Sequence, residues 1–319
     1  MKGELQQFRA TPLPVQELFF HRAGRVIKMY LLGMIAIKPR GNSATFSLEH
    51  AVFFVLLFSL FPLFWNNRGL TIITRASTNS CVQAHGDRNN FRFKVIALAE
   101  NGGHHIAYSK VAMKWLNQLA ADSNFTIDYI STTDAIDDSF LSLYDVFIQL
   151  DYPPYGWKEK AVAAFEKYIM EGRGGWIGFH HATLLGEFDG FPMWQWFYSF
   201  MGSVRFKDYI PGFAQARVEV EDSTHPVMRG VPRDFIINKE EWYTYDRSPR
   251  PNVHVIASVD EKSYKPSSTK VMGDHPVIWS SERVRARNVY IFMGHSPVLF
   301  DDSNYKRIFT NALFWAAAK

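Results

Sequence analysis

The stretch that decides the fold is Gly174–Ala182, which reads GGWIGFHHA. Its apolar part, Gly175–Phe179, has the length of a buried strand, because short apolar runs next to glycine are typical of strands covered on both faces. Two histidines, His180 and His181, follow at once. Ligands of open α/β sheets bind at the carboxyl ends of the strands. The stretch therefore predicts a buried strand that delivers imidazoles to a binding edge.

The segments before this strand alternate between strand and helix patterns. Apolar runs at 93–99, 125–130 and 144–150 predict three strands. Residues 107–121 and 158–171 have apolar side chains at helical spacing. Strands that alternate with helices in this way predict a parallel sheet with helices on both faces.

The second half of the chain is richer in strand patterns. A final helix is expected at Ser303–Ala318, with Ser303 as its N-cap. The predicted strands are Ala214–Val220, Phe235–Asn238, Val253–Val259, Val277–Ser280 and Val289–Met293. An α/β domain with a strand-rich second half follows.

Polar side chains with useful chemistry follow several of these strands. His104 and His105 come after the first strand, Asp151 after the third, and His295 after the last. Because the carboxyl ends of parallel strands share one edge, we expect these residues to meet His180 there. Imidazole titrates near neutral pH, so histidines at such an edge are suited to proton transfer. A histidine that only hydrogen-bonds the backbone is the alternative for each of them.

Several motifs in the same order resemble those of the ThuA-like (trehalose-utilisation) family, whose Gly-rich strand ends in Gly-x-His. The resemblance covers about Phe91 to Lys319. It departs from the family pattern at Glu240, where Asp is usual, and in an extra stretch at 263–275. The matching motifs are Gly174–Ala182, His225–Pro232 (HPVMRGVP), Glu240–Tyr243 (EEWY), Pro276–Trp279 (PVIW) and Gly294-His295.

The family in turn resembles the class I glutamine amidotransferases in fold, a flavodoxin-like arrangement. Those enzymes place a catalytic cysteine on a tight turn after a strand. Here that position holds His180, and Cys81, the one cysteine of the chain, precedes the domain. The attacking group in that chemistry is a thiolate. The resemblance therefore implies the fold without glutamine hydrolysis.

The resemblance implies a carbohydrate-processing protein that acts on a trehalose-like disaccharide or an oxidised (keto) sugar. His180, Glu241 and His295 are its expected acid and base groups, in hydrolysis, elimination or isomerisation. Trp242 would offer an aromatic face to the sugar. The expected substrate-binding residues are His104, His105, Asp151, His181, Trp242 and Tyr243.

Two other functions stay open. The same histidines and Glu241 would furnish three ligands for a divalent metal ion and leave one position open. The chain has no compact ligand motif, so we assign no metal ligand and no cofactor from sequence. The third candidate is a sugar-binding module without catalysis.

The first ninety residues differ from the rest in charge. They carry ten Lys and Arg against four Asp and Glu, whereas residues 91–319 carry a net charge of −2. A domain without basic excess gives no electrostatic support for nucleic-acid binding. The expected partner is a small carbohydrate, and the oligomeric state stays open.

A 15-residue apolar run, AVFFVLLFSLFPLFW, occupies 51–65. This length fits a signal-peptide core better than a spanning helix, and the basic residues before it support export. We predict a leader with linker over 1–90 and the domain over 91–319, located in the periplasm or anchored to a membrane through 51–65. If the start codon is assigned too early, the protein is cytoplasmic.

Overall fold

The computed structural model describes residues 91–99 and 105–318, which belong to one compact unit. The predicted leader and linker at 1–90, with the apolar run 51–65, lie outside the described residues, as does His104. Among the helices that are described, none is long and apolar enough to cross a membrane.

A single nine-stranded sheet organises the domain, in the order β2-β1-β3-β4-β11-β10-β9-β6-β7. Its first five strands are parallel, and the other four run antiparallel to their neighbours. The bounds are β1 Lys94–Ala99, β2 Thr126–Ile130, β3 Val146–Leu150, β4 Gly175–Phe179, β6 Ala214–Val220, β7 Asp234–Glu240, β9 His254–Lys265, β10 Pro276–Ser280 and β11 Asn288–Ile291.

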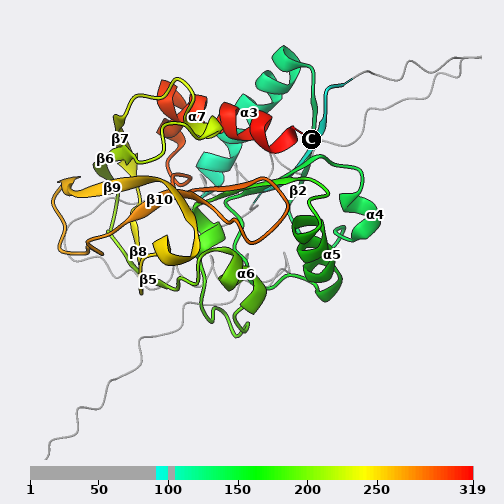
Figure 1. The fold of residues 1–319 in the computed structure, drawn as a ribbon, viewed down its shortest axis with the longest axis horizontal. Helices are drawn as coiled ribbons and strands as arrows, with labels where there is room; N and C mark the ends of the chain where they lie inside the picture. The colour runs from blue at the N-terminus through cyan, green and yellow to red at the C-terminus, as the bar shows by residue number, and fades with distance from the viewer. Residues whose placement is uncertain (1–90, 100–104, 319) are drawn as a thin grey trace, which may run out of the picture. The chain divides into compact units, whose positions relative to one another are not determined.

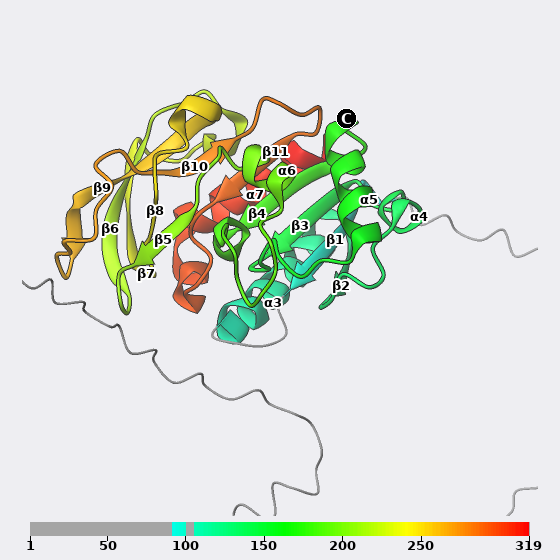
Figure 2. The same cartoon turned by 90° about the horizontal axis from the view of Figure 1, so that it is seen from below.

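Helices cover both faces of this sheet. The helices α3 (Ile106–Ser123) and α7 (Ser303–Ala317) lie on one face, and α5 (Glu159–Met170) and α6 (Gln195–Phe200) lie on the other (Figure 1; Figure 2). Every residue of β3 and β4 is buried, as strands covered on both faces require. The predicted α/β fold with helices on both faces is confirmed.

Shorter elements complete the domain. A second sheet pairs β5 (Phe206–Tyr209) with β8 (Tyr243–Tyr245), and α4 spans Asp138–Leu141. The 3₁₀ turns are η2 (His180–Thr183), η3 (Pro226–Met228), η4 (Arg250–Asn252) and η5 (Pro297–Asp301). Turn η2 follows β4 directly and sets the direction of the two histidines.

Three sequence predictions need correction. The N-cap of α7 is Asp302, whose carboxylate accepts N–H bonds from Asn304 and Tyr305, and Ser303 is the first helical residue. Strand β9 continues to Lys265, into the stretch that resembles no family motif. The short elements α4, α6, β5 and β8 were not predicted, because three to six residues show little periodicity.

Candidate active site

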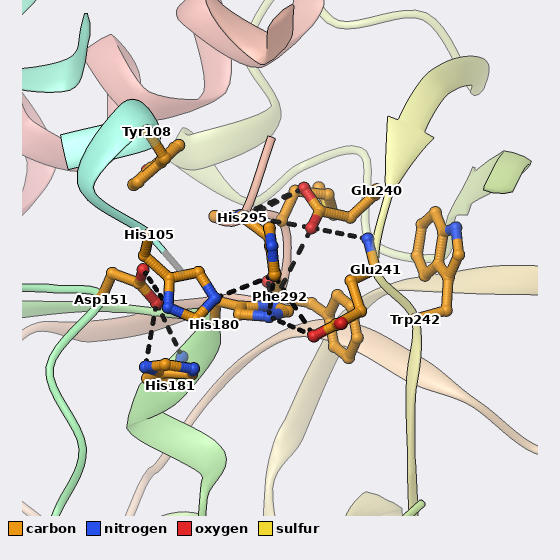
Figure 3. A network of polar contacts seen from close by, with 12 residues as sticks. His105, Tyr108, Asp151, His180, His181, Glu240, Glu241, Trp242, Phe292 and His295 are labelled. Carbon is orange, nitrogen blue, oxygen red and sulfur yellow. Dashed lines mark hydrogen bonds and ion pairs between the residues drawn. The ribbon is translucent and has the colours of Figure 1, made fainter. Parts of the chain in front are cut away.

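Four distant segments meet at the carboxyl edge of the parallel strands, as predicted. His105 begins the turn into α3 after β1, His180 follows β4, and His295 follows β11. Glu241 comes from the opposite side, between β7 and β8. Figure 3 shows their side chains pointing toward one another. The structure thus brings together the three expected acid and base residues and adds His105 to them.

The contacts within this cluster are short. The Nδ1 atom of His295 lies 2.8 Å from Nε2 of His105, 3.3 Å from Nε2 of His180 and 3.2 Å from Oε2 of Glu241. Nε2 of His180 lies 3.4 Å from Oε2 of Glu241. These four side chains each offer one ligand atom, and all four atoms fall within 4.8 Å of one another. Their spacing is that of a metal-binding group.

A hydrogen bond behind His180 and an ion-pair contact behind His105 indicate the tautomers of these two rings. Nδ1 of His180 lies 3.2 Å from the carbonyl oxygen of Phe292, which can only accept, so this nitrogen carries the proton. Nδ1 of His105 lies 3.2 Å from the carboxylate of Asp151, which likewise favours a proton there. In the neutral rings, both Nε2 atoms then present lone pairs to the centre of the cluster.

Asp151, expected from sequence to bind substrate, contacts two imidazoles of the cluster. It is fully buried, and its carboxylate lies between His105 and His181, with its second oxygen 3.6 Å from Nδ1 of His181. It also accepts the backbone N–H of His181 at 3.3 Å. Its φ of 56° is strained for a non-glycine residue, and such strain concentrates at functional sites. Asp151 therefore positions two imidazoles.

Glu240 is a positioning residue that the sequence did not reveal. Its buried carboxylate accepts the backbone N–H groups of Glu241 at 2.9 Å, Gly294 at 3.2 Å and His295 at 3.2 Å. It joins the end of β7 to the segment after β11 (Figure 3). In the sequence, the feature that pointed to Glu240 was its position next to Glu241. That position does not show which of the two neighbouring acids faces inward.

Trp242 and Tyr243 belong to the core instead of a sugar-binding surface. Trp242 is fully buried, stacks on Phe292 at 5.3 Å between ring centroids, and donates its indole N–H to the carbonyl of Ala214. Tyr243 is also buried, and its ring lies 4.2 Å from that of His180. Both rings are packed in the core behind the cluster, so their predicted contact with substrate stays a prediction.

The strained turn at His180 is held by hydroxyl groups. His180 has a φ of 31°, and its carbonyl accepts O–H bonds from Thr183 at 2.9 Å and Tyr290 at 3.1 Å. Gly294 permits the close approach of the next segment, because a Cβ there would lie 2.9 Å from Cβ of His180. Backbone and side chain together therefore fix the distance between His180 and His295.

The charges in the cluster differ between buried and half-buried groups. Burial lowers the pKa of His180 well below its ordinary value, so its imidazole is neutral. Burial alone would raise the pKa of Glu241, but the contact with His295, whose Nδ1 can carry a proton 3.2 Å away, lowers it below the usual range. Burial raises the pKa of Glu240 to about 8. The site thus combines a neutral imidazole with an ionised carboxylate.

One side of the cluster is open to solvent. The side chains of His180 and His105 are 0% and 4% exposed, whereas those of His295 and His181 are each 13% exposed and that of Glu241 is 17% exposed. A ligand that enters from solvent would therefore meet Glu241, His295 and His181 first.

Fold and site together define a flavodoxin-like α/β protein with a histidine-rich site at the carboxyl edge of its sheet. The family model described as ThuA, trehalose utilisation, matches residues 94–316. The chain therefore belongs to the ThuA family, and the resemblance inferred from the motifs is confirmed. A comparison with curated proteins gave no match.

Solved structures agree with this assignment. A protein of Bacteroides uniformis described as ThuA-like is 29% identical, with a TM-score of 0.64 over 71% of this chain and 91% of that one. A protein of Parabacteroides merdae, also described as ThuA-like, is 18% identical, with a TM-score of 0.54 over 71% of this chain and 90% of that one. The second likeness concerns the fold alone.

Proposed function

We propose that this protein is a metal-dependent enzyme that acts on a carbohydrate. The observation that carries the proposal is the set of lone pairs at the centre of the site. Nε2 of His105, Nε2 of His180 and Oε2 of Glu241 surround Nδ1 of His295 at 2.8, 3.3 and 3.2 Å. With Nδ1 of His295 these atoms make four donors that all lie within 4.8 Å of one another, so a single cation could contact all four.

The donor set and its spacing fit a divalent transition metal. Ligand atoms about 2.1 Å from a shared ion lie roughly 3.0 Å apart in an octahedral site and about 3.4 Å apart in a tetrahedral one. Four of the six separations are 2.8 to 3.4 Å, close to this range, and the two from His105 to His180 and Glu241 are within 4.8 Å. Imidazole nitrogens with one carboxylate suit zinc, iron, nickel and related ions better than calcium or magnesium, which prefer oxygen.

The residues around the ligand atoms have defined tasks in this proposal. Asp151 holds His105 and the carbonyl of Phe292 holds His180, and such outer contacts orient metal-binding imidazoles. A bound ion would act as a Lewis acid on a substrate oxygen or a water molecule. His181 lies on the open side beside Asp151 and is our candidate for binding a substrate hydroxyl.

The carbohydrate part of the proposal is supported by the family, whose description is trehalose utilisation. A trehalose-like disaccharide or its keto form brings several hydroxyl or carbonyl oxygens to such a site. Glu241 is 17% exposed, and its carboxylate has a second oxygen beyond the one counted as a ligand, which can accept a hydrogen bond from a sugar hydroxyl. Hydrolysis, elimination and isomerisation all use acid and base groups placed in this way.

Metal analysis tests the proposal directly. Protein purified without a histidine tag should bind one zinc, manganese or cobalt ion per chain, measured by elemental mass spectrometry after loading and desalting. His180→Ala should lose this ion. His254→Ala is the matched control, because His254 pairs with Asp222 at 2.9 Å outside the cluster.

Turnover is then screened with trehalose, other glucosides and their keto forms, with and without a chelator. We expect activity that the chelator removes and added metal restores. Wild-type protein that binds no ion after loading, or His180→Ala that keeps wild-type metal content, would contradict the metal site. Activity on a sugar that survives complete metal removal would instead favour simple acid and base catalysis.

A further inference from the structure

An exposed aromatic side chain stands at the rim of the cluster. Phe213 is 44% exposed, and its ring centroid lies 5.2 Å from that of His295, with the two planes at 82°. The residue immediately precedes β6, and Ala214 pairs with Glu240 in the β6–β7 ladder. Phe213 therefore enters the sheet opposite Glu241, the partly exposed carboxylate of the site.

The backbone that carries Phe213 is fixed from the core. Trp242 donates its indole N–H to the carbonyl of Ala214 at 2.9 Å, and its own carbonyl accepts the N–H of Ile210 at 2.8 Å. Gly212, with φ of 77° and open space around it, makes the turn between these two points. The Phe213 ring therefore projects from a short loop whose two ends both hydrogen-bond to Trp242, the residue next to Glu241. Such support pre-organises a contact.

Two of the other exposed aromatic rings, Tyr209 and Phe191, contact side chains away from the cluster. Tyr209 lies under the ammonium group of Lys270 at 5.6 Å, and Phe191 stacks on Tyr155 at 6.3 Å. Phe213 contacts His295 with its edge or face and still leaves nearly half of its surface to solvent. A large apolar surface held beside polar catalytic groups suits a ligand that is apolar on one face and polar at its edge.

We infer that Phe213 packs against the C–H face of a sugar ring whose hydroxyl groups reach Glu241 and His295. A pyranose has this amphipathic shape, with axial C–H bonds on its faces and hydroxyls around its rim. The inference rests on the proposed function and deepens it, because it assigns a specificity-determining residue that contacts the substrate without binding metal. It also gives Phe213 the task that the sequence assigned to the buried Trp242.

Sugar binding to the metal-loaded protein tests this assignment, with trehalose and methyl α-glucoside as probes in calorimetry. Covering roughly 50 Å² of ring surface corresponds to about a tenfold change in Kd. Phe213→Ala should therefore weaken trehalose binding about tenfold, and Phe213→Tyr should stay within about twofold of wild type. Phe213→Leu, which is apolar but not flat, should resemble the alanine variant.

Phe91→Ala is the matched control, because Phe91 is also exposed, at 37%, but lies before β1 at the opposite end of the parallel strands. Metal content and melting temperature should be unchanged in all four variants, since Phe213 is no ligand. If Phe213→Ala keeps wild-type sugar affinity while His180→Ala loses metal, the inference is overturned and the proposed function stands. If wild type binds metal but neither sugar, the carbohydrate assignment and this inference fail together.

Discussion

Replacing Gly294 by alanine should displace His295 from His180 by more than a metal site tolerates. The new Cβ would lie 2.9 Å from Cβ of His180 and 3.0 Å from Cβ of Phe179, whereas ordinary contacts begin at 3.4 Å. Neither neighbour is the flexible end of a side chain. The backbone at 294 must therefore move by about 0.5 Å, the difference between the required and available distance.

The expected effect follows from this displacement. Metal–ligand distances are set within about 0.2 Å, and disturbing the support of a ligand typically lowers metal affinity by about 10- to 100-fold. Overpacking a close contact costs about 1–3 kcal/mol of folding free energy. A domain of this size loses roughly 2–4 °C of melting temperature per kcal/mol. Gly294→Ala should therefore lose both affinity and some stability.

The assay is competition for zinc against a chromogenic chelator, together with thermal unfolding of metal-free protein. Gly186→Ala is the control, because its Cβ would lie 3.0 Å from the outer edge of the Phe188 ring, which can rotate aside. It should keep wild-type metal affinity. If Gly294→Ala melts earlier but binds zinc as wild type does, Gly294 serves packing alone, and the separation of His180 and His295 does not define the ion site.

Three further predictions concern other parts of the network. Asp151→Asn removes the charge behind His105 without changing shape, so zinc affinity should fall about 10- to 100-fold in the same competition assay; unchanged affinity would remove Asp151 from the site. Glu240→Ala leaves one buried and two partly buried N–H groups without their acceptor, so the free energy of unfolding in urea should fall by about 3 kcal/mol, and a loss below 1 kcal/mol would contradict the network. Hydrogen bonds from His275 and two backbone N–H groups lower the pKa of Glu261 against the opposing effect of burial. The stability that this lowered pKa gives is present above about pH 4.5 and is lost as pH falls through the lower, folded-state pKa. Below pH 4.5 the urea midpoint of Glu261→Gln should therefore change less with pH than that of wild type. A midpoint that falls as steeply with pH as in wild type would refute the assignment.

The edge of the sheet at which the site forms was predictable from sequence. Buried strands such as Gly175–Phe179 consist of short apolar runs, and parallel strands bring their carboxyl ends to one edge. His105, His180 and His295 meet for this reason. The rule uses only chain position, so it worked before any side-chain geometry was known.

What the sequence could not show is the direction of individual side chains. Glu240 and Glu241 are adjacent acids, yet one is buried against backbone N–H groups and the other faces the histidines. Trp242 is a residue type that often stacks on sugars, but its ring packs on Phe292 in the core. The exposed aromatic ring beside the cluster belongs to Phe213. These outcomes depend on which face of a strand end meets the core. In the antiparallel half of the sheet, tertiary packing determines that face.

The strained turn at His180 holds one side chain in a fixed direction, and this positioning does not depend on the chemistry that the side chain performs. A non-glycine residue at positive φ costs about 1–3 kcal/mol and persists only where its surroundings enforce it. Here the hydroxyls of Thr183 and Tyr290 bind the carbonyl of His180 and hold the turn in place. Because Nδ1 of the His180 imidazole donates to the carbonyl of Phe292, the strained turn directs its Nε2 toward Glu241 and His295. The strained backbone of this turn therefore serves to hold one lone pair, on Nε2 of His180, in a fixed direction within the site.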